Sequence, residues 1–216
     1  EALYGHYAKI FDSWQAQGIE VPPVFIVVCN NTATSKLVYD YISGFERTIE
    51  HTGPNGEKTE TRTLENGRLK LFRNYDEHGQ KLARPRTLLI DSEQLESGDA
   101  LDGNFREMAA DEIERFRREL RERGDSATAE NITDQYLLRE VINTVCERGG
   151  LGESVRCLVS VGMLTEGWDA NTVTHILGVR AFGTQLLAEQ VVGRGLRRRS
   201  YAVEDTPEGE RFALEY

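Results

Sequence analysis

Cysteine, histidine and proline are scarce in this chain. The spacing of the cysteines and histidines argues against a disulfide framework and against a metal site. The 216 residues include 3 cysteines, 4 histidines and 5 prolines. Cys29, Cys146 and Cys157 lie in apolar surroundings, and no two of them form a C-x-x-C pair. The histidines are scattered without the spacing of metal ligands. We therefore expect buried, reduced thiols, and neither a disulfide framework nor a metal site.

Long apolar runs and a positive net charge are also absent. The chain has no apolar run of about 18 residues and no recognisable secretory leader, which predicts a soluble, cytoplasmic protein. Asp and Glu outnumber Lys and Arg by 36 to 26, for a net charge of −10. This balance argues against a strongly basic nucleic-acid binder, so contact with nucleic acid must use a local patch or a shared cleft. Because the first residue is Glu1 rather than Met, we expect a part of a longer polypeptide.

Three short apolar runs, at residues 24–29, 156–161 and 173–179, alternate with helical patterns and predict buried strands of one sheet. Residues 87–90 predict another strand. Strands that alternate with helices favour an α/β fold with an open, mostly parallel sheet flanked by helices. We expect a lead-in helix within residues 1–20, the main domain over residues 21–200, and the start of a following segment at 201–216.

A stretch of different character, about residues 47–125, is expected to be an insertion into the main domain. Its first part is polar and rich in Thr, with turn signals at residues 53–56 and at Asn66-Gly67, and it predicts a small β-ribbon. The Asn66-Gly67 pair is the stronger hairpin signal. The second part predicts one long, highly charged helix over residues 104–123.

Two further helices are predicted from possible cap residues. Thr34 or Ser35 is expected to cap a helix that runs to about Phe45. Thr133 or Asp134 is expected to start another, which continues to about residue 145.

The segment 190–197, which reads Q-x-x-G-R-x-x-R, carries the most specific chemistry of the chain. Residues 185–196 are rich in Leu, Ala, Glu, Gln and Val and predict a helix. On that helix Gln190, Arg194 and Arg197 are spaced i, i+4 and i+7 and share one face. Two guanidinium groups and an amide on one face suit a polyphosphate, since Arg binds phosphate oxygens in pairs. The alternative is a solvated basic helix end that complements the helix dipole.

Two loops that follow predicted strands carry further candidate residues. In the loop 162–171, Gly167 allows a tight turn and the Asp169 carboxylate can accept hydrogen bonds from a ribose hydroxyl. After the first strand, Asn30, Asn31 and Thr32 offer amide, hydroxyl and main-chain groups that bind phosphate without net charge. The alternative is that these residues only form turns and cap helices.

Two acidic patterns resemble parts of nucleotide sites but lack the required context. Residues 88–93 resemble a magnesium-binding strand end, and residues 76–79 resemble a fragment of a DEAH box. Both would require a neighbouring P-loop, and the chain contains no G-x-x-x-x-G-K-[ST]. We therefore interpret Asp91 as a strand-end or cap residue, and residues 76–79 as a hairpin turn.

Taken together, these segments resemble motifs of superfamily 2 helicases and translocases. Residues 190–197 resemble motif VI, residues 162–171 resemble motif V, and residues 30–32 resemble motif IV. The runs FIVVCNNT, LIDSEQLESG, MLTEGWDA and EQVVGRGLRR together are similar to the restriction (Res) subunit of type III restriction enzymes. The resemblance implies the second RecA-like domain of a DNA-dependent ATPase. A first RecA-like domain with the P-loop would precede it, and a nuclease domain could follow it.

The resemblance also assigns expected roles to the residues of the three motifs. ATP with Mg²⁺ would be bound mainly by the preceding domain, while Arg194, Arg197 and Gln190 would act on it as catalytic residues. Nucleotide contacts are expected at Gly167, Asp169 and Gly193, and contacts with double-stranded DNA at Asn30, Asn31, Thr32 and Thr165. A DNA methyltransferase subunit is a further expected partner. Two alternatives stay open, namely another superfamily 2 motor and a non-catalytic module that binds DNA or protein.

Overall fold

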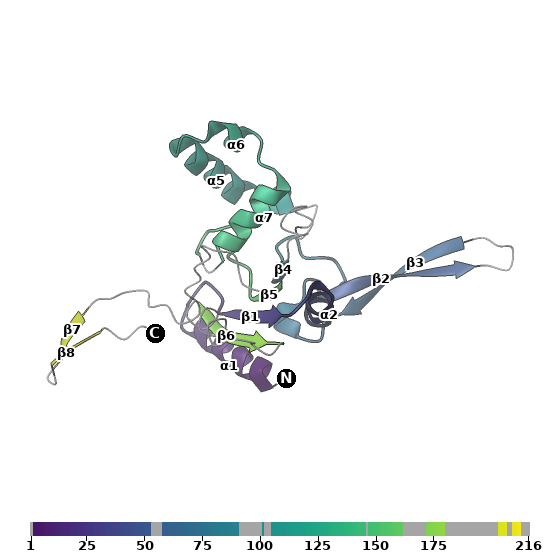
Figure 1. Ribbon diagram of the computed structural model, residues 1–216, viewed down its shortest axis with the longest axis horizontal. Coiled ribbons are helices and arrows are strands. Elements are labelled where there is room, and N and C mark those ends of the chain that lie inside the picture. Colours follow the sequence, from purple (N-terminus) through teal and green to yellow (C-terminus); the bar gives the residue numbers. More distant parts are fainter. Residues whose placement is uncertain are drawn as a thin grey trace.

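The structure is a computed structural model that describes residues 2–52, 58–90, 101, 105–145, 147–161, 172–179, 203–206 and 209–212. Figure 1 shows how its helices and strands are arranged. The helices are α1 (Ala2–Ala16), α2 (Thr32–Ser43), the short 3-10 helix η1 (Lys70–Phe72), α4 (Phe105–Met108), α5 (Ala110–Glu122), α6 (Ser126–Glu130) and α7 (Asp134–Asn143). The strands are β1 (Val24–Cys29), β2 (Gly44–Thr52), β3 (Lys58–Asn66), β4 (Thr87–Ile90), β5 (Cys157–Val161), β6 (Val173–Gly178), β7 (Val203–Thr206) and β8 (Gly209–Phe212).

The centre of the molecule is a parallel sheet of four strands in the order β4-β5-β1-β6. Strand β1 lies between β5 and β6 and pairs in parallel with both. All six of its residues are buried, as expected for a continuous apolar run in a sheet covered on both faces. The predicted α/β class and the mostly parallel sheet are confirmed.

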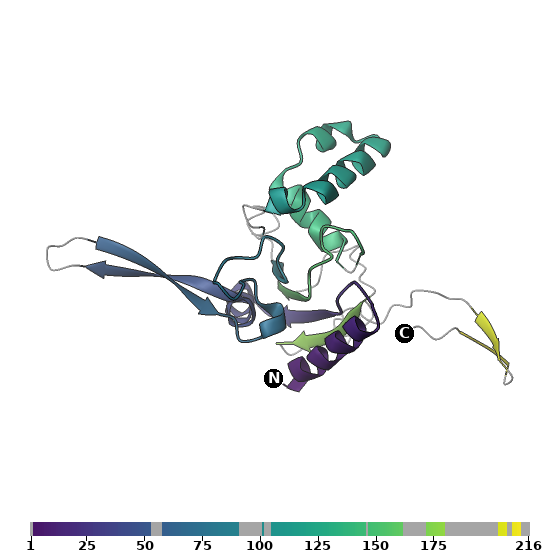
Figure 2. The same ribbon diagram turned by 180° about the vertical axis from the view of Figure 1, so that it is seen from behind.

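Side chains of successive strand residues alternate between two hydrophobic cores, one on each face of the sheet. Helices α4 to α7 cover one face, where Ile26 and Leu158 lie at the centre of the core. Helices α1 and α2 cover the other face and meet Val27 and Val159 (Figures 1 and 2). The alternation follows from the two-residue period of a strand, which sends neighbouring side chains to opposite faces.

Helix α1 is part of this second core rather than a loosely attached leader. Its Tyr7 ring is fully buried against Phe25 and Phe72, and the Tyr7 hydroxyl donates to the carbonyl oxygen of Pro23 at 2.8 Å. A second link joins His6 Nδ1 to Nε2 of the buried His175 on β6, at 2.9 Å. Helix α1 is thereby fixed to both the start of β1 and the middle of β6.

The predicted β-ribbon exists, but one of its turn signals has a different role. Strands β2 and β3 pair antiparallel over their whole length and project away from the sheet (Figures 1 and 2). The hairpin prediction for Asn66-Gly67 is wrong, because Asn66 pairs with Gly44 at the base of the ribbon. Gly67 is required there for a steric reason, since a side chain on it would overlap the carbonyl oxygen of Ile42. The other turn signal, at 53–56, falls outside the described residues.

Two helix predictions also need correction. Helix α2 begins earlier than expected, because Asn31 rather than Thr34 or Ser35 is its N-cap. The single helix predicted over residues 104–123 is divided into α4 and α5 at Ala109, where φ is −110° and ψ is 24°. No Gly or Pro marks that break in the sequence. The prediction for α7 is confirmed, since the Thr133 side chain accepts from the N–H of Tyr136.

The stretch predicted as one insertion, residues 47–125, contains a strand of the central sheet. Strand β4 pairs in parallel with β5 from Thr87 to Ile90. The ribbon therefore belongs to the connection that runs from β1 to β4, and helices α4 to α7 belong to the connection from β4 to β5. The pair β7–β8 forms a separate two-stranded sheet within residues 201–216.

The two described cysteines are buried, as the sequence predicts. Cys29 and Cys157 are buried free thiols, and burial raises the pKa of both. Cys146 lies outside the described residues. No helix in the described part of the chain is long and apolar enough to cross a membrane.

The contact between His6 and His175 predicts a dependence of stability on pH. Burial, and secondarily the charge of His6, lowers the pKa of His175 in the folded chain. The unfolded chain therefore binds more protons, so stability decreases as the pH falls below the ordinary pKa of His, about 6.5. One proton contributes at most about 1.4 kcal/mol per pH unit. We expect the free energy of unfolding, measured with urea, to decrease less between pH 7.5 and pH 5.0 in His175→Phe than in the wild type. An equal loss in both chains would contradict this, and His78→Gln, in an exposed turn, is the control.

Candidate functional site

The candidate site lies at the edge of the sheet where the parallel strands end. The three neighbouring strands β5, β1 and β6 end there at Val161, Cys29 and Gly178. In the strand order β4-β5-β1-β6, the connection that follows β1 leads to β4, whereas the connection that follows β5 leads in the opposite direction, to β6. In open α/β sheets, a crevice suited to ligands forms where the connections from two adjacent strands run in opposite directions.

The loop that follows β1 leads directly into the N-terminus of α2. The Asn31 side-chain oxygen accepts from the N–H of Thr34 at 2.8 Å, so the amide serves as a helix cap. The N–H of Ser35 bonds to the carbonyl oxygen of Asn31, and the buried Ser35 hydroxyl donates back to the carbonyl oxygen of Thr32. The N–H groups at the first two helical positions have no acceptor within a helix, and here they lie in an exposed turn. These groups and the positive end of the helix dipole suit an anion such as a phosphate.

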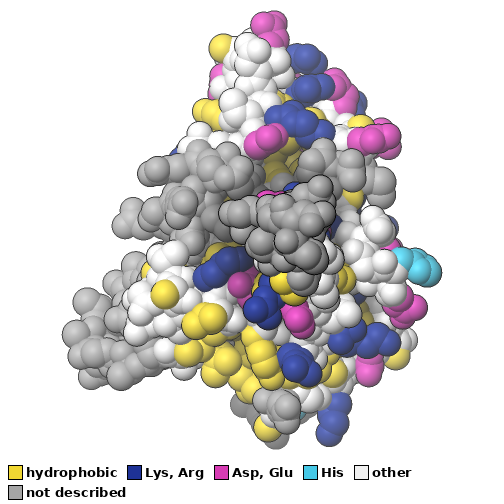
Figure 3. All heavy atoms as spheres, turned by 90° about the vertical axis from the view of Figure 1, so that its right-hand side faces the viewer, with side chains coloured by type: hydrophobic (Ala, Val, Ile, Leu, Met, Phe, Trp, Pro, Cys, Tyr) yellow, Lys and Arg dark blue, Asp and Glu magenta, His cyan; other side chains and the backbone are white. Residues whose placement is uncertain are grey.

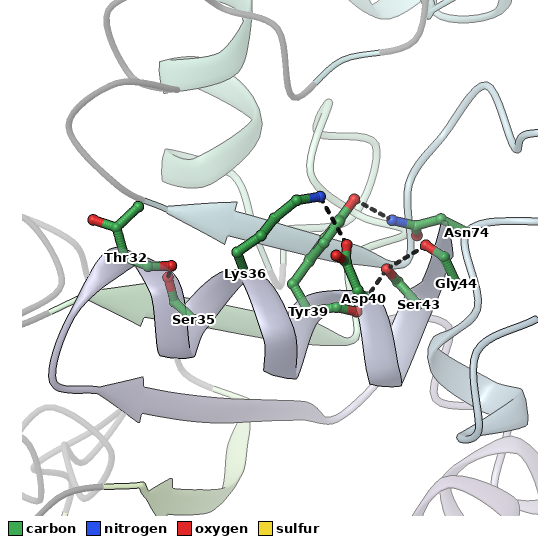
Figure 4. A network of polar contacts seen from close by, with 8 residues as sticks. All are labelled: Thr32, Ser35, Lys36, Tyr39, Asp40, Ser43, Gly44 and Asn74. Atoms are coloured by element: carbon green, nitrogen blue, oxygen red, sulfur yellow. Dashed lines mark hydrogen bonds and ion pairs between the residues drawn. The ribbon is translucent and has the colours of Figure 1, made fainter. Parts of the chain in front are cut away.

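The opposite end of α2 is fixed to the sheet by a buried polar network (Figure 4). Asn74 Nδ2 donates to the Tyr39 hydroxyl at 3.0 Å and to the carbonyl oxygen of Thr87 at 2.8 Å. Asn74 Oδ1 accepts from the N–H groups of Arg86 and Thr87. The Ser43 hydroxyl donates to the carbonyl oxygen of Tyr39. The amide thus has all its hydrogen-bonding capacity satisfied, and α2 is held at a defined angle that places its N-terminus at the candidate site.

The charge at this edge is close to neutral within the described residues of the loop and α2. Lys36, the basic residue of α2, forms an ion pair with Asp40 at 2.7 Å one turn along the helix. Cys29, at the end of β1, is buried, and burial raises its pKa. A thiol with a raised pKa is a poor nucleophile, so among the described residues of this loop the groups that can contact a ligand are neutral hydrogen-bond donors.

An apolar groove of about 410 Å³ adjoins the loop and was not predicted from the sequence (Figure 3). It lies between α1, α2 and β6, and hydrophobic side chains gather on this face of the molecule. Leu37 and Tyr41 of α2 are 72% and 53% exposed along it, although both are large and hydrophobic. The remaining lining residues are Leu3, Tyr4, Phe25, Val27, Thr34, Val38, Ile42, Leu69, Leu177 and Val179. The spacing of Leu37 and Tyr41, one turn apart, is the sequence signal that could have revealed this surface.

The structure describes one of the three predicted motif segments. Asn30 and Thr32 are exposed at the strand end, and Asn31 is the helix cap. The other predicted site residues lie outside the described residues, namely Gly167, Asp169, Thr165, Gln190, Gly193, Arg194 and Arg197. Their segments follow β5 and β6 directly, since residues 162–171 come after Val161 and residue 180 comes after Val179. Within the described part of the chain, no group of three or more His, Cys, Asp or Glu side chains is arranged to hold a metal ion.

The turn at residues 76–79 agrees with its interpretation as a hairpin. Tyr75 and Lys81 form an isolated antiparallel bridge, and the Asp76 carboxylate accepts from the N–H groups of His78 and Gln80. The backbone hydrogen bond from Gln80, and further backbone hydrogen bonds, lower the pKa of Asp76. Its carboxylate therefore stabilises a turn. Asp91 lies outside the described residues.

Comparison with known proteins gives no relative for this chain. No family model, no curated protein and no solved structure matches it.

The loop predicts different consequences for its two asparagines. Asn31→Ala removes the helix cap and is expected to reduce the free energy of unfolding by about 1 kcal/mol. Asn30→Ala is the matched control, because Asn30 is exposed and is expected to change stability by less than about 0.5 kcal/mol. Urea unfolding of the two variants measures the difference, and equal stability losses would contradict the assignment of Asn31 as the cap.

Proposed function

We propose that this chain is the second motor domain of a DNA-dependent ATPase or translocase of the type III restriction (Res) kind. The observation that carries the proposal is the order of the strands. Strands β5, β1 and β6 are neighbours that end at the same edge, and in the sequence each precedes one of the three segments that resemble helicase motifs. The ends of β1 and β5, which are more than 100 residues apart in the sequence, are thereby adjacent.

The donors at this edge fit a polyphosphate lying across an interdomain cleft. ATP with Mg²⁺, held mainly by a preceding RecA-like domain, supplies the phosphoanhydride bond that is hydrolysed. Arg194 and Arg197 would stabilise the negative charge that develops on the transferred phosphoryl group, and Gln190 would order the same face. Asp169 would accept hydrogen bonds from the ribose. Loss of these contacts after hydrolysis would let the two domains separate.

DNA would be gripped through its backbone by the loops after β1 and β5. Asn30, Thr32 and the first N–H groups of α2 are exposed neutral donors, and Thr165 lies in the neighbouring segment. Neutral donors at a helix N-terminus bind phosphate oxygens without sequence preference. This mode of contact reconciles a net charge of −10 with a polyanionic partner.

The apolar groove is proposed to seat the run 185–196, which the sequence predicts to be helical. The groove wall ends at Val179, and five residues, 180–184, separate Val179 from that run. Such a connection has the length usual between a strand and a helix and reaches at most about 18 Å. A helix with Ala188, Val192 and Leu196 toward the groove would cover the exposed side chains of Leu37 and Tyr41. Gln190 and Arg194 would then face away from the sheet, toward the cleft.

The function is tested by DNA-stimulated ATP hydrolysis. We expect no activity from this chain alone, and activity from the intact polypeptide that contains it together with a P-loop domain. Arg194→Ala in the intact polypeptide should reduce turnover by roughly 10³-fold or more, as for other arginine fingers, without changing the circular dichroism spectrum. Undiminished turnover in the folded variant would overturn the assignment of Arg194. Absence of ATPase activity in the intact polypeptide would instead favour a non-catalytic module that binds DNA or protein.

Docking in the groove is tested by proteolysis of this chain. Leu37→Glu places a carboxylate in the apolar wall, which weakens the packing of an apolar helix by about 1–3 kcal/mol. We expect trypsin to cleave after Arg194 and Arg197 about 10-fold faster in this variant than in the wild type, because cleavage follows the population of the undocked state. Ala16→Glu introduces the same charge at an exposed position outside the groove and is the control. Equal cleavage rates in the three chains would refute this docking.

A further inference from the structure

A second cavity, of about 240 Å³, opens at the opposite edge of the sheet, where the strands begin. Its walls come from the end of α1, from the segment before β1, and from the residues that precede β4 and β5. Phe11, Trp14, Pro22 and Pro23 supply apolar and aromatic surface. This cavity shares no lining residue with the groove beside the candidate motor site.

One side chain in this cavity, Arg156, has a charge that the described residues do not balance. Its guanidinium lies 4.6 Å from the centre of the Phe11 ring, and its Nη1 donates to the carbonyl oxygen of Leu71 at 3.2 Å. Its Nε is buried and has no hydrogen-bond partner. No carboxylate among the described residues forms an ion pair with it. A buried polar group without a partner requires an explanation, and an absent ion or ligand is one of the few available.

The surroundings of Arg156 increase the cost of its charge. Burial, and secondarily the charge of Arg86, lowers the pKa of Arg156. Arg86 itself forms no ion pair with a described carboxylate. Two neighbouring guanidinium groups without a counter-charge favour an anion, which would offset both the desolvation and the repulsion.

The carboxylates that line the cavity already have other partners. Glu20 is paired with Arg148, and Glu153 accepts from the N–H of Gly149 at 2.9 Å. The other arginine of the cavity, Arg84, is paired with Glu112 at 2.6 Å. Arg156 is therefore the lining cation that remains available to an incoming anion.

We propose that this cavity binds a carboxylate attached to a small apolar or aromatic body, with Arg156 as the group that recognises the carboxylate. A guanidinium binds a carboxylate through two parallel hydrogen bonds, while the Phe11 ring and the neighbouring aromatic and proline surfaces suit the apolar body. The volume lies below the range of roughly 300–1,000 Å³ that is typical of drug-sized ligands, which limits the ligand to a small acid or a single side chain. The proposal does not depend on the motor function.

The carboxylate has two possible sources with the same chemistry, a free organic acid or an acidic side chain from elsewhere in the intact polypeptide. If the acid is free, a small carboxylate probe binds this chain and the intact polypeptide equally well. If a protein side chain fills the cavity, the probe binds this chain but not the intact polypeptide. In that case Arg156→Met also destabilises the intact polypeptide by a larger margin than this chain.

The probe is benzoate, and benzamide is its neutral control of the same shape. Trp14 lines the cavity and the chain has 2 tryptophans, so a Trp168→Phe background makes Trp14 the reporter. We expect benzoate to change Trp14 fluorescence saturably at constant ionic strength, and benzamide to bind about 10-fold more weakly or not at all. Arg156→Met should weaken benzoate binding by about 10-fold or more. Lys9→Met removes an exposed cation of α1 that does not line the cavity and pairs with neither Glu20 nor Glu153, so it should leave binding within about twofold.

A second variant guards against loss of the fold. Arg156→Lys keeps the charge but not the paired donors, so it should bind benzoate more weakly than the wild type and more tightly than Arg156→Met. The proposal is overturned if benzoate does not bind the wild-type chain or if benzamide binds it as well as benzoate does. It is also overturned if folded Arg156→Lys and the wild type both bind the two probes with equal affinity.

Discussion

The parallel pairing of β1 between β5 and β6 is the constraint on which the remaining structure depends. A parallel pair cannot be joined by a tight turn, so each connection must cross a face of the sheet, and both faces become covered. The same constraint brings all strand ends to one edge. Residues 30–32, 162–171 and 180–197 owe their common starting edge to this pairing and not to any interaction among themselves.

The two edges of the sheet differ in how they can attract an anion. At the edge where strands end, the described donors are neutral, and Lys36 is engaged by Asp40. At the edge where strands begin, Arg86 and Arg156 lack carboxylate partners within the described chain. Neutral donors on a helix N-terminus can bind a phosphate without a full opposite charge. A half-buried guanidinium without a carboxylate partner favours an anion that supplies the counter-charge.

Helix α2 links the core to the candidate site. Its C-terminal half is fixed by Tyr39, Ser43 and Asn74, whereas its N-terminus is capped by Asn31 at the strand end. The face between these ends exposes Leu37 and Tyr41 along the apolar groove. A single helix thus presents exposed N–H groups at one end and the wall of an apolar groove along its side. If the run 185–196 docks in the groove as proposed, its movement would act directly on the turn at the start of α2.

Periodicity and local chemistry in the sequence were sufficient to predict the strands of the central sheet, the ribbon, α1 and α7, but not the pair β7–β8. Apolar runs such as residues 24–29 have a meaning that does not depend on their neighbours, because only a strand buried on both faces accommodates them. Features that depend on tertiary contacts could not be predicted in this way. Gly67 marks close packing against Ile42 rather than a turn, and α4 and α5 separate at Ala109 without any local signal.

The sequence by itself determined the class of fold, because the class follows from the type and spacing of residues along the chain. The chemistry of the motif segments and the residues that would carry it stay predictions. The tertiary structure alone decided that β4 belongs to the central sheet, since that depends on which strand its backbone pairs with. It also decided that Leu37 and Tyr41 line a groove with β6, and that Arg156 has no carboxylate partner among the described residues. Both features depend on contacts between segments that are more than 80 residues apart in the sequence, and no local sequence pattern predicts such contacts.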